Sequence, residues 1–229
     1  WVPFVEWGYV ALVATLAQGI LASVALILLP LIVLRRAPGA RGARSGTLLY
    51  FAALGLAYMF LEIAFMQILM RFLAYPLYAV TVVLTSFLTF SGGGSLLAQR
   101  LSGHPVRTVA GAAAGIAGLA ALYLALLPWL FRAGAGWPDG MKIALAALVL
   151  APLAFCMGIP FPVGLRSVAE RHEALLPWAW GINGCASVVG TALATLAAVH
   201  AGFIAVVGLA VVLYAMAPLA LSRTVRRAV

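Results

Sequence analysis

Seven long apolar stretches divide this chain, and its charged residues are almost confined to the short segments between them. A helix needs about 20 apolar residues to cross the hydrocarbon core of a bilayer, and each stretch comes close to that length. A soluble domain of 229 residues could not bury a composition that is 66% hydrophobic and only 8% charged. The pattern therefore predicts an all-α protein, a polytopic membrane bundle formed by one transmembrane domain over residues 1–229. The seven predicted transmembrane helices are residues 8–34, 47–72, 77–98, 109–131, 141–158, 178–200 and 203–221.

The positions of Lys and Arg predict how this bundle is oriented. Cytoplasmic loops of membrane proteins carry an excess of both residues. Of the 14 Lys and Arg residues, only Arg71, Arg132 and Lys142 fall on one side when the seven spans alternate. We therefore expect the N-terminus outside and the C-terminus in the cytoplasm. The cytoplasmic arginines that we expect to contact anionic lipid are Arg35, Arg36, Arg41, Arg44, Arg223, Arg226 and Arg227.

A polar segment and a cluster of helix breakers surround the end of the fifth span. Residues 161–173 mix apolar and charged side chains, which predicts a short amphipathic helix on the cytoplasmic surface; an ordinary polar loop is the alternative. Pro152 lies within the preceding span, and Gly158, Pro160 and Pro162 follow at its end. Prolines interrupt helices, and broken helices often form binding sites in transporters. A plain helix stop ahead of the surface helix explains the same residues.

Glu62 is the acidic residue that lies deepest inside a predicted span. It falls about 22 Å along the helix from the expected cytoplasmic end. A carboxylate at that depth costs at least about 2.5–3.5 kcal/mol, so we expect it to be protonated or paired. Either a ligand-contacting group or a neutral acid bonded within the bundle fits. The candidate partners of Glu62 are Gln67, Gln18, Asn183 and Arg71. The candidate intramembrane polar site comprises Glu62, Gln67, Asn183 and Gln18.

Small residues at three- and four-residue spacing predict where helices approach closely, because they bring backbones together in a membrane. Such residues occur in the fourth and sixth spans. The predicted packing residues are Gly111, Gly115, Gly184, Ser187 and Gly190.

Several function classes are excluded by what the chain contains. The net charge of +9 follows the topology, and no folded module remains that could bind nucleic acid. The run SGGGS at residues 91–95 lacks the Lys-Ser/Thr of a phosphate-binding loop. Cysteines and histidines are dispersed, so we expect no metal site, no catalytic residues and no cofactor in this chain. Membrane lipids and an unknown bound lipid or lipophilic molecule are the ligands that we expect.

Several motifs of this chain resemble one known family. They run in order over most of the chain and are YFAALGLAYMFLEIAFMQ (residues 50–67), PLY (76–78), SGGGS (91–95), GIPFPVGLR (158–166) and PWAWGING (177–184). In this combination they resemble the membrane part of bacterial spermidine-synthase-like integral membrane proteins.

This resemblance implies a location and a partner domain. Such proteins join helices in the bacterial cytoplasmic (inner) membrane to a soluble Rossmann-like domain, similar to aminopropyltransferases and to methyltransferases that use S-adenosylmethionine. The chain resembles the membrane module that follows this domain. The Gly-rich cofactor loop and acidic catalytic residues of the domain are absent here, so no catalytic residue is carried over. Only Glu62, Gln67 and the motifs at 158–166 and 177–184 match the family pattern.

Three functions remain compatible with these observations. The first is a non-catalytic membrane module that anchors or orients a spermidine-synthase-like transferase domain outside this chain, with an intramembrane pocket at Glu62. The second is an accessory subunit of a larger respiratory or photosynthetic membrane complex, packed against other membrane protein subunits. The third is a small transporter, for which one acidic residue and a few amides offer a sparse polar path.

Overall fold

The computed structural model describes residues 3–25, 29, 41–101 and 103–225, and these residues form helices joined by short turns, with no strand. Four of the helices begin with a proline, which suits the first helical position, where a missing N–H removes no hydrogen bond. In chain order the helices are α1 (Pro3–Ser23), α3 (Arg41–Leu73), α4 (Pro76–Arg100), α5 (Pro105–Ala133), α6 (Asp139–Met157), α7 (Pro160–His172), the 3₁₀ turn η2 (Glu173–Leu175) and α8 (Leu176–Val225).

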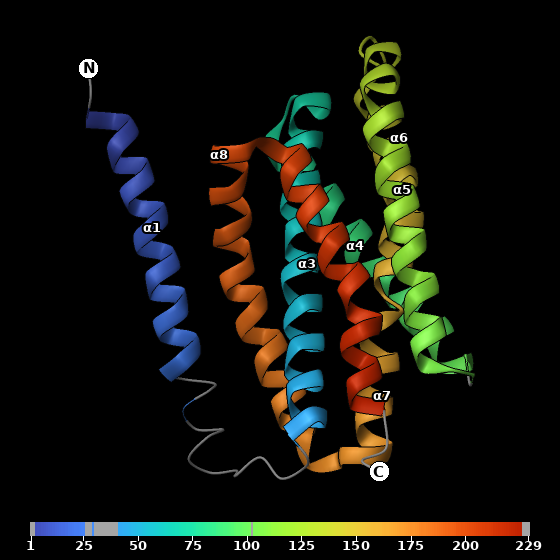
Figure 1. Ribbon diagram of the computed structural model, residues 1–229. Helices are drawn as coiled ribbons and strands as arrows, with labels where there is room; N and C mark the ends of the chain where they lie inside the picture. The colour runs from blue at the N-terminus through green and yellow to red at the C-terminus, as the bar shows by residue number, and fades with distance from the viewer. Residues whose placement is uncertain (1–2, 26–28, 30–40, 102, 226–229) are drawn as a thin grey trace.

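Helix α8 is a hairpin of two helical arms. Gly202 interrupts it with φ 79° and ψ 168°, a backbone conformation that glycine adopts without a steric penalty. The first arm, residues 176–201, and the second arm, residues 203–225, run in opposite directions in Figure 1. We call the upper end of the bundle in Figure 1 the Gly202 end, and the lower end, where α7 lies, the α7 end.

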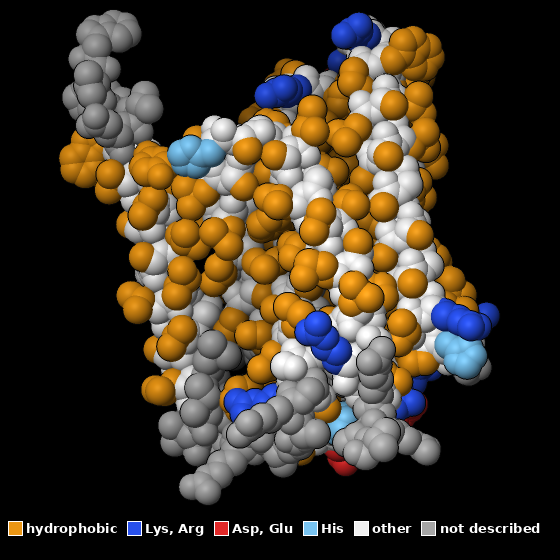
Figure 2. Space-filling view, viewed as in Figure 1, with side chains coloured by type: hydrophobic (Ala, Val, Ile, Leu, Met, Phe, Trp, Pro, Cys, Tyr) orange, Lys and Arg blue, Asp and Glu red, His pale blue; other side chains and the backbone are white. Residues whose placement is uncertain are grey.

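The described helices make this a multi-pass membrane protein. Helical segments long and apolar enough to cross a bilayer occupy Ala43–Leu73, Pro76–Arg100, Pro105–Ala133 and the continuous run Asp139–Val225, which includes both arms of α8. A shorter apolar helix covers Trp7–Ser23. Hydrophobic side chains cover the middle of the molecule in Figure 2, whereas Lys and Arg side chains lie toward its two ends.

The helices lie close to the stretches that hydropathy predicts. The predicted spans 47–72, 77–98 and 109–131 lie inside α3, α4 and α5. The span 141–158 matches α6 to within two residues, and the spans 178–200 and 203–221 match the two arms of α8. The predicted first span extends to residue 34, and its last part lies outside the described residues.

Helix α3 lies at the centre of the described bundle and packs most extensively against α8 (Figure 1). Glycines allow this close packing. A Cβ at Gly46 would lie 2.9 Å from the Ala220 carbonyl oxygen in the second arm, and one at Gly55 would lie 2.6 Å from the Asn183 carbonyl oxygen in the first. Because carbonyl oxygens of the backbone cannot move aside easily, both contacts require glycine.

Helix α7 follows α6 after a short interruption. Gly158 and Ile159 both keep right-handed helical angles, and Pro160 begins α7. The interruption falls at Pro160 and Pro162, which have no N–H to donate to α6 and so cannot continue its hydrogen-bond pattern, while Pro152 is accommodated inside α6.

The predicted surface position of α7 is wrong in one respect. The helix forms at the predicted place, but its apolar face is covered by other helices, since Val163 and Val168 are buried in the protein. A face buried in this way cannot lie on lipid. Its position is determined by contacts with α3, α4, α5 and α8, which a hydrophobic pattern does not reveal.

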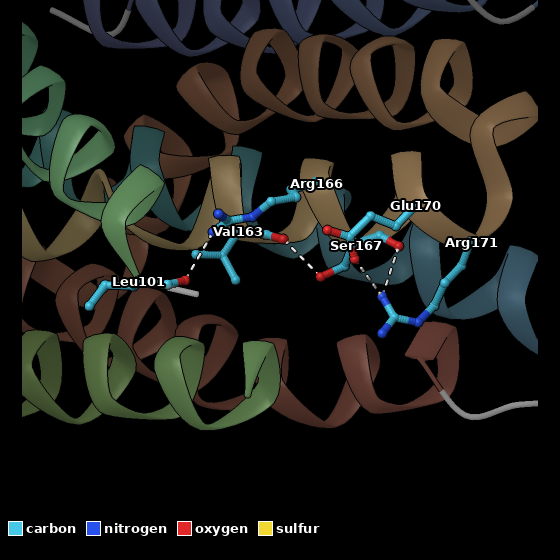
Figure 3. Close-up of polar contacts among 6 residues, drawn as sticks. All are labelled: Leu101, Val163, Arg166, Ser167, Glu170 and Arg171. Carbon is cyan, nitrogen blue, oxygen red and sulfur yellow. Dashed lines mark hydrogen bonds and ion pairs between the residues drawn. The ribbon is translucent and has the colours of Figure 1, made fainter. Parts of the chain in front are cut away.

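Arg166 of α7 holds the end of α4 at the α7 end of the bundle. Its guanidinium group donates to the carbonyl oxygens of Ala98 (2.8 Å), Leu101 (3.2 Å) and Gln99 (3.4 Å), and Figure 3 shows the bond to Leu101. The last carbonyl groups of a helix have no partner within it, and a cation is favoured beside them. Arg171, one turn further along α7, pairs with Glu170 on the surface at 3.2 Å.

We expect Arg166→Gln to lower the free energy of unfolding by about 1–2 kcal/mol, because charge-assisted bonds to three carbonyl groups are lost. Arg171→Gln is the matched control and should change it by less than about 0.5 kcal/mol, since its ion pair is exposed. Thermal unfolding in detergent and hydrogen exchange at residues 98–101 measure the two effects. Equal losses in both variants would contradict a capping role for Arg166.

Candidate functional site

Four of the sequence motifs meet at one groove in the α7 half of the bundle. The groove has a volume of about 450 Å³, within the usual range for ligand pockets. We call it the motif groove. Its lining residues are Leu54, Gly55, Tyr58 and Met59 from α3; Leu88, Ser91, Gly92 and Ser95 from α4; Met157, Gly158, Phe161 and Pro162 from α6, α7 and the turn between them; and Trp180, Asn183, Ser187 and Tyr214 from α8.

Two glycines from different motifs bring α4 and α6 into contact beside the motif groove. A Cβ on Gly94 of α4 would overlap the Phe155 carbonyl group of α6, and one on Gly158 would overlap the backbone of Ser91. Helices α4 and α6 therefore touch through their backbones, as small residues allow in membranes. The glycine run at residues 92–94 lies inside α4, before its last turn.

Gly92 faces the motif groove. A Cβ at this position would meet no described atom within 4 Å, although the residue lines the groove. Gly93 has an intermediate amount of space, because a Cβ placed on it would contact the Phe155 ring at 3.5 Å. The three consecutive glycines thus differ, and only Gly94 requires the absence of a side chain.

Hydroxyl and amide groups lie along the motif groove. The Tyr58 hydroxyl lies 3.5 Å from the Ser91 hydroxyl, so a hydrogen bond joins α3 and α4. The Asn183 amide donates to the Phe51 carbonyl oxygen at 3.1 Å, and the Ser187 hydroxyl donates to the Asn183 carbonyl oxygen at 3.0 Å. These groups are neutral and suit hydrogen bonding to a ligand.

Aromatic residues close the motif groove toward the α7 end. Phe161 makes edge-to-face contacts with Phe51 and Trp180, at ring-centroid distances of 5.3 and 5.0 Å. Beside them, the buried Tyr50 donates its hydroxyl to the Pro160 carbonyl oxygen at 2.6 Å. Its ring occupies the space where Gly164 lacks a side chain. This contact joins α3 to the start of α7 and holds the GIPFP turn in place.

Glu62 lies one helical turn beyond Tyr58 on the same face of α3, toward the Gly202 end. Its side chain is half-buried, and no described residue forms a hydrogen bond or an ion pair with it. The suggested pairing with Asn183 is wrong, because that amide bonds Phe51, about 16 Å along α3 from Glu62. Arg71 is no ion-pair partner either; its guanidinium carbon lies 5.4 Å from the centre of the Phe203 ring.

The predicted polar residues do not form one site. Gln67 is half-buried on α3, and Gln18 is exposed on α1. Neither forms a hydrogen bond with a described residue. Asn183 belongs to the motif groove instead, and Glu62 lies just outside the residues that line it.

The predicted packing residues have different surroundings. Gly190 packs against Leu56 and Met59, both 3.3 Å from a Cβ placed on it, and Gly115 lies against the Cys156 sulfur at 3.2 Å. A Cβ at Gly111 would meet no described atom within 4 Å. Gly184 and Ser187 lie half-buried on the first arm of α8.

The arginines predicted to contact lipid are partly outside the described residues. Arg44 is exposed and lies 5.1 Å from the centre of the Trp178 ring, and Arg223 is exposed near the end of α8. Arg41 begins α3, and its side chain is outside the description. The residues that lie wholly outside it are Arg35, Arg36, Arg226 and Arg227.

The side chains that line the motif groove carry no ionisable acid or base other than the hydroxyls of Tyr58 and Tyr214. The lining contains no Asp, Glu, His, Cys, Lys or Arg, and Glu62, one turn beyond Tyr58, lies just outside it. The described residues also contain no group of three His, Cys, Asp or Glu side chains that could hold a metal ion. Sequence reasoning missed Tyr58, Ser91, Ser95 and Tyr214, although a tyrosine one turn before Glu62 in an apolar span was a usable signal.

No protein-family model, curated protein or solved structure matches this chain.

Proposed function

We propose that this chain is a non-catalytic membrane module that holds a lipophilic ligand in the motif groove and anchors a spermidine-synthase-like transferase domain. The observation that carries the proposal is the meeting of four distant motifs on one groove of about 450 Å³. Packing alone explains Gly94 and Gly158. It does not explain Gly92, Ser95 and Ser187, which line open space.

The chemistry of the motif groove defines the ligand class. Its lining is mostly apolar, with hydroxyl and amide groups from Tyr58, Ser91 and Asn183. Such a lining suits a lipophilic molecule with one polar group. Glu62, which forms no hydrogen bond or ion pair with a described residue, lies one turn away and would favour an amine at the end of the ligand.

The distribution of charge supports an orientation with the α7 end in the cytoplasm. Six arginines with described side chains lie at the α7 end, whereas Arg71, Arg132 and Lys142 lie at the Gly202 end. The six are Arg44, Arg100, Arg107, Arg166, Arg171 and Arg223. We propose seven crossings of a bacterial inner membrane, formed by α1, α3, α4, α5, α6 and the two arms of α8. The transferase domain would then lie beside α7, close to the aromatic end of the groove.

Purification of the full-length protein from its native membrane, in mild detergent, tests both parts of the proposal. We expect a lipophilic compound to co-purify at about one molecule per protein. We also expect the purified material to bind S-adenosylmethionine or its decarboxylated form, through a domain on the same polypeptide or a partner chain. Mass spectrometry of extracted compounds and calorimetric titration measure the two properties.

Gly92→Phe provides the blocking variant, because its side chain would enter the motif groove without meeting a described atom near its Cβ. Gly111→Phe is the matched control, since that glycine is also open but lies outside the groove. The compound should be lost in the first variant and retained in the second. Retention in both would contradict the groove as its site. Co-purification with respiratory subunits, without binding of S-adenosylmethionine, would favour the accessory-subunit alternative.

A further inference from the structure

A second cavity lies at the Gly202 end and shares no lining residue with the motif groove. It has a volume of about 610 Å³ and lies between α3, α5 and the two arms of α8. Alanines and Gly202 on α5 and α8 leave this space open. Almost all of its lining is apolar, and the polar side chains are those of Arg71 and Tyr123.

The length of this cavity matches one leaflet of a membrane. Along α5 its lining extends from Phe131, near the helix end, to Ala120. Eleven residues of helix correspond to about 16 Å. The hydrocarbon core of a bilayer is about 30 Å thick, so one leaflet is about 15 Å deep. The cavity therefore extends about as far as an acyl chain reaches from the headgroup level to the bilayer centre.

Arg71 supplies a cation at the mouth of the cavity. It lies in the last turn of α3, is exposed, and has no hydrogen bond or ion pair with a described residue. Its guanidinium lies over the Phe203 ring, next to the Gly202 turn. The Tyr123 hydroxyl already donates to the Val149 carbonyl oxygen. Arg71 is thus the lining group left to bind an anion.

We propose that this cavity binds one acyl chain of an anionic phospholipid whose phosphate group contacts Arg71. Charge complementarity selects the headgroup, because an arginine at the membrane interface attracts anionic lipid. Its guanidinium can also donate two parallel hydrogen bonds to a phosphate. The apolar walls below it hold the acyl chain. The lipid fills the space between α5 and α8 and stabilises the hairpin turn at Gly202.

Native mass spectrometry of the delipidated full-length protein tests this site. The probes are phosphatidylglycerol and phosphatidylcholine with the same acyl chains. We expect one phosphatidylglycerol to bind about tenfold more tightly than phosphatidylcholine. Arg71→Gln should remove this preference and leave equal affinities. Arg132→Gln is the charge control, because Arg132 ends α5 outside the cavity, and it should retain the full preference.

A second pair of variants tests the apolar part of the site. Ala198→Phe fills the cavity and should abolish binding of both lipids at this site, whereas the neighbouring Val199→Phe, exposed and outside the lining, should leave binding unchanged.

Equal affinity of the wild type for both lipids, or a preference retained in Arg71→Gln, would overturn the proposal. Equal lipid binding by Ala198→Phe and Val199→Phe would also overturn it. If Ala198→Phe fails to fold, the Arg71 and Arg132 variants decide. Because the motif groove is separate, none of these results bears on its ligand.

Discussion

Gly94→Ala is expected to prevent stable packing of α4 against α6 and to lower the free energy of unfolding by about 3 kcal/mol or more. The added Cβ would lie 3.0 Å from the Phe155 carbonyl carbon and closer still to its oxygen. Overpacking usually costs about 1–3 kcal/mol, and here the neighbour is backbone, which cannot change rotamer. Gly158→Ala should behave alike, since its Cβ would lie 2.7 Å from the Ser91 Cα.

The adjacent glycines are the controls for this prediction. Gly92→Ala should leave stability unchanged or raise it slightly, because alanine is the better helix former and the position is open. Gly93→Ala should have a small effect, since 3.5 Å from the Phe155 ring is an ordinary contact. Chemical denaturation in detergent measures the free energy of unfolding of Gly92→Ala, Gly93→Ala and Gly94→Ala. Equal stability of all three would show that α4 and α6 do not touch in the way described.

Tyr50→Ala is expected to lower the free energy of unfolding by about 3–5 kcal/mol. It removes a fully buried aromatic ring and the hydroxyl that donates a hydrogen bond to the Pro160 carbonyl oxygen. Tyr50→Phe isolates the hydrogen bond and should cost about 1–3 kcal/mol. Both variants should also increase hydrogen exchange at the start of α7. Thermal unfolding in detergent measures the loss.

The exposed tyrosines provide the control for Tyr50. Tyr75→Phe and Tyr78→Phe change the same group at positions that are 57% and 41% exposed, and both should leave stability within about 0.5 kcal/mol. A loss in Tyr50→Phe no larger than in these variants would mean that the bond to Pro160 contributes nothing measurable.

The helices could be predicted because the signals for them are local. An apolar stretch of sufficient length marks a span, and prolines at the first positions of α4, α5 and α7 mark where helices begin. Gly202 falls between the sixth and seventh predicted spans, where the chain must reverse. Each of these features depends on residues that are close together in the sequence.

The candidate site could be predicted only in part. The motifs at residues 91–95, 158–166 and 177–184 contribute to the motif groove, and Asn183 lies in it. Glu62, however, forms no hydrogen bond or ion pair with a described residue, and the Asn183 amide bonds Phe51. Hydropathy shows that a helix enters the membrane but contains little information about its rotation or its neighbours. Polar pairs between helices depend on both.

By itself, the sequence determined that this is a helical membrane protein, where its helices run, and on which segments its charges fall. Those properties follow from the cost of placing polar groups in hydrocarbon. Each segment must avoid that cost by its own composition and helical hydrogen bonds, whatever its neighbours are. The tertiary structure alone decided that Gly94 meets Phe155, that Arg166 holds the end of α4, and that Arg71 lies at the mouth of an apolar cavity. These contacts join residues distant in the chain, and they depend on how backbones and side chains of several helices fit together at once.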